Sequence, residues 1–410
     1  MSLVAMAMTG CALVAGLGTS FSTSSSEADA SGDAPDARPD APDAALPDSA
    51  DAPDATAPDA TDATAPDARD STVSLDAADA SSPDADASSP SPCASAGLCA
   101  CVDAGGACLL AAGQGYPFNL VVDSTSVYWL NAPDGGEGAV LQCPLAGCGA
   151  SGPQTIAGQL TGPYGLAVGG GNVYWTEPGA ASVDIQPISG GGVSLIDAAQ
   201  LVPTGITLAA TGPMTTTVYW TSNTPDGGIW SASLTDTTAI QLVYGQSSPL
   251  GIATDGTSVY WTNNVDGPSG GGVYSAPLGT NPGGNATMLQ GSQPFPTAIA
   301  VYGGSVYWIN AATDAGLGSV QACTLASACM SGGQLAGHLL GPSQIASDGM
   351  NVYWTDTPAG TVVKCAVGGC AGAPSNIAIG QQMPWGIAVD GTSVYWTTWI
   401  ADGGVWKAPK

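Results

Sequence analysis

Residue types that commonly carry out catalysis are scarce in this chain. Of its 410 residues, 33 are Asp or Glu, five are Lys or Arg, and one is His. The histidine, His338, stands where related stretches have a glutamine after a glycine, at Gln114, Gln159, Gln246 and Gln381. A Ser-His-Asp triad needs a base that an acid orients, and nothing marks His338 in that way. We therefore interpret His338 as a glutamine substitute in a connecting loop.

Carboxylates are the remaining option for chemistry. Four aspartates recur at equivalent places, Asp123, Asp255, Asp348 and Asp390, and their recurrence predicts a structural role in turns. Calcium is an alternative at the loops 134–137 and 226–228, although each offers only one or two carboxylates. Calcium takes six to eight oxygen ligands, so we expect no metal and no other cofactor, with calcium kept as the alternative.

A tripeptide repeat indicates which elements hold these residues. Val-Tyr-Trp occurs seven times at intervals of 41 to 47 residues, with its tryptophans at Trp129, Trp175, Trp220, Trp261, Trp308, Trp354 and Trp396. Each copy contains four short runs rich in β-branched and aromatic residues, bounded by Gly, Pro, Asp and Asn. Such a repeat of four antiparallel strands predicts an all-β chain built of propeller blades.

The two ends of the repeat array complement each other. The last copy stops after its third strand, and the segment 107–113 before the first copy matches the missing fourth strand. We therefore predict a seven-bladed β-propeller over 107–410, in which 107–113 is the outer strand of the last blade. Sharing one blade between both ends removes a free sheet edge and closes the ring.

The eleven cysteines indicate an oxidising compartment. Three local pairs each span the turn between a third and a fourth strand, where disulfide geometry is accessible: Cys143–Cys148, Cys323–Cys329 and Cys365–Cys370. Four more cysteines, Cys93, Cys99, Cys101 and Cys108, lie in or beside the lead-in 93–106, and their pairing stays open. A zinc site formed by these four is the competing interpretation.

One position varies in an informative way between copies. In a propeller, the first strands line the central channel, and the residue between Pro and Gly at the start of each strand lies at one mouth of that channel. Phe118, Tyr164, Leu250 and Trp385 occupy this position in four copies, and aromatic faces of this kind suit a sugar or an apolar side chain. They are our candidate ligand-binding residues, and packing within the loops is the alternative.

The repeat resembles the Tyr-Trp-Thr-Asp (YWTD) propeller repeats of lipoprotein-receptor ectodomains. Residues 353–356 match the motif fully, and 260–263 and 174–177 match it nearly. That family has six blades, so the resemblance implies a propeller without implying the same function. The whole chain is also similar to secreted bacterial proteins that join a lipoprotein signal and an Asp/Ala/Pro-rich tail to such a ring.

The first 92 residues differ in composition from the repeats. Residues 1–21 look like a lipoprotein signal segment, with Cys11 as the lipidated residue, although no basic residue precedes it. An ordinary signal segment with an incidental Cys11 is the alternative. Residues 22–92 are almost entirely Ala, Asp, Pro, Ser and Thr, which predicts a disordered acidic linker.

These patterns favour a non-enzymatic binding protein. The net charge of −28 argues against nucleic acid as a partner. We expect a propeller that is anchored by lipid in a bacterial cell envelope, in the outer membrane, and that recognises a protein or a glycan. A hydrolase or lyase that uses channel-facing carboxylates, with or without a metal, is one alternative, and a structural surface lipoprotein is another.

Overall fold

The computed structural model describes residues 106–410, apart from 134–135, 213–214, 235, 267–270, 280–282, 285, 312–316, 331 and 371–372. The predicted signal segment, the acidic linker and all but the last residue of the lead-in therefore lie outside the described residues. No helix in the described part is long and apolar enough to cross a membrane.

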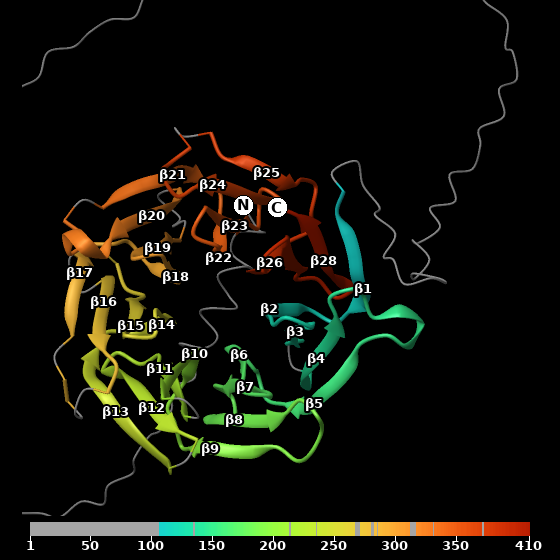
Figure 1. The fold of residues 1–410 in the computed structure, drawn as a ribbon, viewed down its shortest axis with the longest axis horizontal. Coiled ribbons are helices and arrows are strands. Elements are labelled where there is room, and N and C mark those ends of the chain that lie inside the picture. Colours follow the sequence, from blue (N-terminus) through green and yellow to red (C-terminus); the bar gives the residue numbers. More distant parts are fainter. Residues whose placement is uncertain are drawn as a thin grey trace, which may run out of the picture. The chain divides into compact units, whose positions relative to one another are not determined.

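The described chain forms seven four-stranded antiparallel sheets arranged around a central axis (Figure 1). Blades 1 to 3 consist of β2 Pro117–Val122, β3 Ser126–Asn131, β4 Gly138–Pro144 and β5 Gln154–Leu160; β6 Leu166–Gly169, β7 Asn172–Glu177, β8 Ser182–Pro187 and β9 Ser194–Ala198; and β10 Pro203–Gly212, β11 Thr215–Ser222, β12 Gly227–Ser233 and β13 Asp236–Gln246. In each blade the first strand lies nearest the axis and the last lies at the rim.

Blades 4 to 7 follow the same order. They consist of β14 Pro249–Thr254, β15 Ser258–Asn263, β16 Gly272–Pro277 and β17 Thr287–Gly291; β18 Pro296–Tyr302, β19 Ser305–Asn310, β20 Gly318–Thr324 and β21 Gly333–Leu339; β22 Pro342–Ser347, β23 Asn351–Asp356, β24 Thr361–Ala366 and β25 Ser375–Ala378; and β26 Pro384–Val389, β27 Ser393–Thr398, β28 Gly403–Pro409 and β1 Cys108–Gln114. The described residues contain no α-helix, and two 3₁₀ turns are present, η1 Gly149–Ser151 and η3 Leu325–Ser327.

The ring is closed as the sequence predicts. Strand β1 pairs antiparallel with β28 and completes blade 7, so the seven-bladed architecture and the role of residues 107–113 are confirmed. Leu110 of β1 is buried in a core cluster with Trp129 of blade 1 and Tyr395 of blade 7. The N-terminal strand therefore also helps to fill the seam between the first and last blades.

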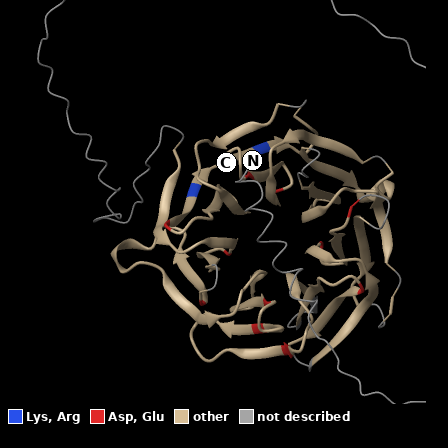
Figure 2. Cartoon of the chain, turned by 180° about the vertical axis from the view of Figure 1, so that it is seen from behind, with Lys and Arg blue, Asp and Glu red and all other residues tan. Residues whose placement is uncertain are grey.

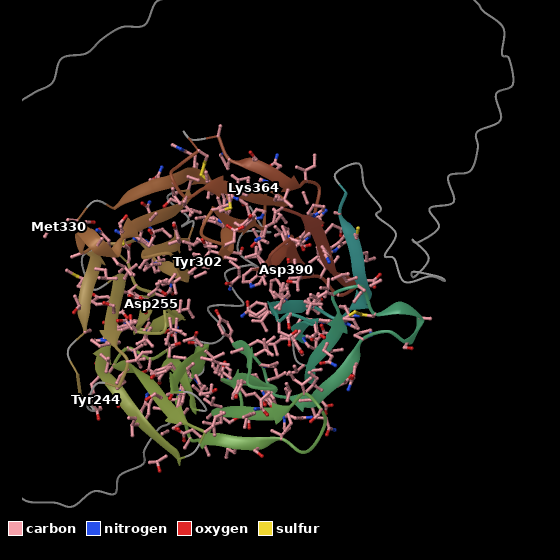
Figure 3. The ribbon with its side chains drawn as sticks, viewed as in Figure 1. Tyr244, Asp255, Tyr302, Met330, Lys364 and Asp390 are labelled. Carbon is pink, nitrogen blue, oxygen red and sulfur yellow. A yellow bond between two sulfur atoms is a disulfide. The ribbon has the colours of Figure 1, made fainter. Side chains whose placement is uncertain are left out.

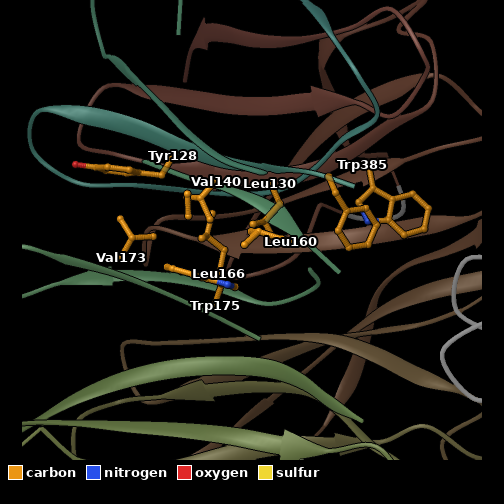
Figure 4. Close-up of a cluster of buried hydrophobic side chains, with 10 residues drawn as sticks. Tyr128, Leu130, Val140, Leu160, Leu166, Val173, Trp175 and Trp385 are labelled. Carbon is orange, nitrogen blue, oxygen red and sulfur yellow. The ribbon is translucent and has the colours of Figure 1, made fainter. Parts of the chain in front are cut away.

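The Val-Tyr-Trp motif builds the core between blades. Side chains alternate across a strand, so Tyr and Trp of one motif point to opposite faces of their blade. Each of the seven buried clusters accordingly combines the Tyr of one blade with the Trp of the next, as Tyr128 and Trp175 do between blades 1 and 2 (Figure 4). All seven tryptophans are buried, so the repeat is a packing device that joins neighbouring blades.

The three predicted local disulfides are present, between Cys143 and Cys148, Cys323 and Cys329, and Cys365 and Cys370. Each joins the end of a third strand to the turn that follows it. Cys108 is disulfide-bonded too. Cys93, Cys99 and Cys101 lie outside the described residues, so the pairing among these four stays open.

Candidate functional site

The turns at the start of the inner strands are held by a hydrogen-bond relay between blades. The threonine that follows Tyr-Trp accepts a bond from the backbone N–H after the variable residue of its own blade, as Thr397 does from Gly386 at 2.9 Å. Its hydroxyl then donates to the carbonyl of the variable residue in the next blade, from Thr176 to Thr204, Thr221 to Leu250, Thr262 to Thr297, Thr355 to Trp385 and Thr397 to Phe118, at 2.6–2.9 Å. The last of these bonds joins blade 7 to blade 1. Blades 1 and 5 have Leu130 and Ile309 in place of the threonine, so the relay is interrupted after each of them.

Three of the four candidate residues meet in one cluster. Phe118 lies between Tyr164 and Trp385, with ring centroids 5.4 and 5.3 Å away. Trp399, after the second strand of blade 7, lies 5.2 Å from Trp385 and 6.3 Å from Phe118, and Tyr116 lies 6.2 Å from Trp399. We call these five residues of blades 7, 1 and 2 the aromatic cluster; Figure 4 shows Trp385 at one end of the core between blades 1 and 2.

The aromatic cluster is filled at its centre and partly open at its edges. Phe118 and Trp385 are each 8% exposed, whereas Tyr116, Tyr164 and Trp399 are half-buried. Leu250 is also buried, but it belongs to blade 4 and stands apart from the cluster. Tyr116 and Trp399 were missed in the sequence because neither occupies the position between Pro and Gly. The signal for Trp399 was its place three residues after Trp396, where other copies have Ala, Pro, Asn or Thr.

Two polar groups in the aromatic cluster lack a partner. The indole N–H groups of Trp385 and Trp399 are shielded from solvent, and neither has a hydrogen-bond acceptor. A buried donor without an acceptor costs about 1–3 kcal/mol. The cluster is therefore incompletely satisfied in the free protein, unlike most of the repeat tryptophans.

Inner strands provide a channel wall without ionised groups. The strands β2, β6, β10, β14, β18, β22 and β26 contain no Asp, Glu, His, Lys, Arg or Cys. Their polar side chains are hydroxyls and amides such as Asn119, Thr207 and Gln344. The wall can therefore offer hydrogen bonds and apolar contact, but no acid, base or thiolate.

Glutamines satisfy the indole N–H of most repeat tryptophans. Trp220, Trp261, Trp308 and Trp396 donate to Gln200, Gln246, Gln293 and Gln381 at 2.9–3.2 Å. The accepting glutamine comes from the preceding blade, and for Trp175 of blade 2 that position is Leu160, at the end of β5 in blade 1. Glu177 of blade 2 accepts the bond from Trp175 instead, at 2.8 Å. The sequence therefore compensates for the missing acceptor within the blade of Trp175 itself.

The alignment of His338 with the glutamines was off by one residue. His338 has a φ of 59° and Gln159 a φ of 62°, which match the left-handed glycines Gly113, Gly245 and Gly380 that precede the glutamines, so Gln159 was displaced by one residue as well. Leu339 therefore takes the glutamine position, and the indole N–H of Trp354 has no acceptor. His338 is exposed on the outermost strand of blade 5, away from the inner strands.

The four recurring aspartates hold turns, as predicted. One carboxylate oxygen of Asp255 accepts the backbone N–H groups of Thr257 and Ser258 at 2.8 and 2.9 Å, and the other accepts the Tyr260 hydroxyl at 2.8 Å. Asp123, Asp348 and Asp390 make equivalent bonds. Burial raises the pKa of Asp255, but the bonds from Thr257, Ser258 and Tyr260 outweigh it and lower the pKa. Burial, and then the bond to Asp255, raises the pKa of Tyr260 to about 12.

Blade 2 contains a buried pair of carboxylates. Asp184 and Glu177 are 6% and 7% exposed, and Ser182 donates to Asp184 at 2.6 Å. Glu177 also accepts the backbone N–H of Thr161 at 2.7 Å. Burial raises the pKa of Asp184 to about 6, the Ser182 bond opposes that rise, and the Glu177 charge adds to it. The pair lies on second and third strands, so it does not face the channel as an acid-base couple would.

We predict that Asp184→Asn stabilises the protein at pH 7.5 by about 1–3 kcal/mol, because the buried charge disappears. The pKa of Asp184 is raised in the fold, so the native state binds more protons between pH ~4 and ~6, and stability from this group falls as pH rises through that window. Urea unfolding from pH 4 to 8 measures the effect, with the exposed Asp226→Asn as control. An Asp184→Asn protein that keeps the wild-type pH dependence would contradict the prediction.

No group of three or more His, Cys, Asp or Glu in the described residues could hold a metal ion. The calcium alternative at 134–137 stays a prediction, because Asp134 lies outside those residues. In the other loop, Asp226 is an exposed residue in a turn between β11 and β12.

Comparisons with known proteins identify the fold alone. No family model and no curated protein matches the chain. Among solved structures, virginiamycin B lyase from Staphylococcus aureus superposes with a TM-score of 0.56 at 15% identity, over 74% of this chain and 98% of the lyase. A catalytically inactive His-to-Ala variant of that lyase with quinupristin gives 0.57 at 14% identity, over the same shares. A chain of a nidogen/laminin complex gives 0.46 at 21% identity, over 60% of this chain and 89% of that one. At these identities the lyase structures show that this chain shares their overall fold, and no more than that.

Proposed function

We propose that this protein is a non-enzymatic binding module that recognises a protein or a glycan at the channel mouth formed by the aromatic cluster. The observation that carries the proposal is the pairing of this cluster with inner strands that contain no ionised side chain. Binding needs apolar contact area and a few placed polar groups, which the mouth offers. Acid-base or nucleophilic catalysis needs titratable groups beside the substrate. Tyr302 and the recurring aspartates lie at the ends of the strands opposite the aromatic cluster, so they are not beside a ligand bound there.

A lyase is the second candidate, because the virginiamycin B lyase shares the fold. Its inactive variant is defined by the replacement of one histidine. The single histidine of the present chain, His338, lies on the outermost strand β21 and faces solvent. Asp184, whose pKa is raised to about 6 by burial, lies on a third strand. Both placements favour binding over lyase chemistry.

A thermal-shift screen of the full chain against soluble glycans and peptides, with and without calcium, tests the proposal. A ligand whose binding is lost in both Tyr164→Ala and Trp399→Ala supports binding at the mouth. Binding that survives both substitutions contradicts it. Turnover of a ligand that depends on Asp184 or His338 would favour the enzyme instead, and a screen without any ligand would favour a structural surface protein.

We further propose that the propeller is held at a bacterial cell envelope, at the outer membrane, by lipid on Cys11, with residues 22–92 as a linker. The motif ending in Gly10-Cys11 and the disulfides both support an extracytoplasmic location. We predict that Cys11→Ser moves the protein from the membrane fraction to the soluble fraction, because a single lipidated residue supplies the anchor. Fractionation and metabolic labelling with a fatty acid measure this, and a Cys11→Ser protein that remains membrane-bound refutes it.

A further inference from the structure

The charged residues around the aromatic cluster indicate which class of ligand the proposed mouth could bind. The three described basic residues, Lys364, Lys407 and Lys410, all belong to blades 6 and 7, and Figure 2 shows basic positions only in that sector. Lys410 forms an ion pair with Asp348 at 2.7 Å, and Lys407 donates to the Leu145 carbonyl at 3.1 Å. Both partners lie in turns at the ends of the strands opposite the aromatic cluster. Lys364 lies on β24, the third strand of blade 6, and not on an inner strand. None of the three described lysines is therefore placed at the aromatic cluster, which argues against an anionic ligand.

The shape of the aromatic cluster narrows the class further. Phe118 and Trp385 stack with an interplanar angle of 26° and fill the centre of the cluster. A peptide usually anchors by inserting a side chain into a pocket. Rings in direct contact leave no space between them for such a side chain. Tyr116, Tyr164 and Trp399 are only half-buried, so a flat ligand could lie against the edge of the cluster that they form.

The unpaired hydrogen-bond donors of the aromatic cluster indicate which polar atoms the ligand should carry. The indole N–H groups of Trp385 and Trp399 are donors without acceptors. A ligand that brings neutral oxygen acceptors beside an apolar ring face would satisfy them and remove the cost of two unpaired donors. Because both groups are shielded in the free protein, the indoles must turn outward to reach such a ligand, and the half-buried Trp399 is the less confined of the two.

We propose that the ligand of the aromatic cluster is an uncharged carbohydrate, whose sugar ring stacks on Trp399 and Tyr164 and whose hydroxyl oxygens accept the indole N–H groups. The proposal rests on the binding function proposed above. Apolar C–H faces, neutral hydroxyls and the absence of charge are combined in a pyranose polymer. The acidic charge of the chain does not oppose such a ligand, whereas it would repel a polyanion.

Affinity electrophoresis of the full chain through gels that contain starch, xylan, mixed-linkage β-glucan or galactomannan tests this proposal. We expect retardation by at least one of these neutral polymers and none by polygalacturonate. Trp399→Ala should weaken retardation about tenfold through loss of the stacking face. Trp385→Phe, which keeps a ring but removes the N–H, should weaken it about threefold to tenfold. Trp406→Phe is the matched control, because Trp406 stacks on Trp396 in the same blade, outside the cluster.

The outcomes separate this inference from the binding function itself. If no neutral polymer retards the wild-type protein, or if polygalacturonate retards it more strongly, the proposal of an uncharged carbohydrate ligand is wrong. The proposal that some other ligand binds at the aromatic cluster then still stands. Binding of a poly-L-proline peptide that is lost in Trp399→Ala, without polysaccharide binding, likewise overturns the carbohydrate and keeps the mouth. If a polysaccharide binds equally well to Trp399→Ala, Trp385→Phe and wild type, both proposals fall. Thermal melting of each variant excludes unfolding as the cause.

Discussion

Replacing Gly386 by Ala is expected to destabilise the ring by about 2–3 kcal/mol, as overpacking at a closed contact does. A Cβ atom at this position would collide with the carbonyl oxygen of Phe118 in the neighbouring blade and would press on Leu120. That carbonyl also accepts the hydrogen bond from Thr397 that joins blade 7 to blade 1. A shift of Phe118 that relieved the collision would therefore weaken this bond. Denaturant unfolding followed by tryptophan fluorescence measures the change.

Gly391→Ala is the matched control for Gly386→Ala. Gly391 lies in the turn between β26 and β27 of the same blade, its φ is not left-handed, and a Cβ there meets nothing within 4 Å. We expect a change within about 0.5 kcal/mol, typical of a surface site. Equal unfolding midpoints for the two variants would show that the inner strands of blades 7 and 1 are not packed as described.

Leu110→Asp should have the largest effect on stability, a loss of at least ~3 kcal/mol. Leu110 is 5% exposed and lies in β1, where it fills the seam between the last and first blades, so the substitution buries a charge without a partner. Hydrogen–deuterium exchange should then show β28 exchanging faster, because the outer strand of blade 7 is released.

Ala112→Asp is the control for Leu110→Asp. It also adds an aspartate to β1, but at an exposed position, so it tests whether the loss of stability comes from burying the charge. We expect near wild-type stability and unchanged exchange in β28. If Ala112→Asp and Leu110→Asp behave alike, or if neither changes exchange in blade 7, the N-terminal strand does not close the ring.

Much of the fold could be predicted because the repeat records a physical unit seven times. Val-Tyr-Trp places Tyr and Trp on opposite faces of every second strand, and that alternation forces each blade to pack on two neighbours. The complementary ends gave the closure through β1, and the shared position of the cysteine pairs gave the three disulfides.

The aromatic cluster could not be predicted in full, because it depends on contacts between different copies of the repeat and not on the sequence of any one copy. Phe118, Tyr164 and Trp385 share a repeat position with Leu250, yet only the first three belong to adjacent blades, 7, 1 and 2, and so meet. Trp399 breaks the repeat pattern, and nothing in its own copy shows which rings it touches. His338 was misaligned by one residue because the left-handed backbone position, and not the residue type, fixes the register there.

Both mouths of the channel carry aromatic residues, which makes the location of binding measurable. Figure 3 places Tyr302 close to the channel, together with Asp255 and Asp390, whereas Tyr244 and Met330 lie towards the rim. Tyr302 is 53% exposed and lies in the turn that ends β18, at the end of the strands opposite the aromatic cluster. Met350, in the equivalent turn of blade 6, is 76% exposed. These two residues report on the opposite mouth.

Hydroxyl-radical footprinting of the full chain, with and without the ligand that the thermal-shift screen selects, tests the central claim most directly. The account predicts that the ligand protects Tyr116, Tyr164 and Trp399 from oxidation, leaves Tyr302 and Met350 as reactive as before, and is recovered chemically intact. Protection of Tyr302 and Met350 with an unprotected aromatic cluster, or recovery of a cleaved ligand, would contradict the claim that this propeller binds at the aromatic mouth without turnover.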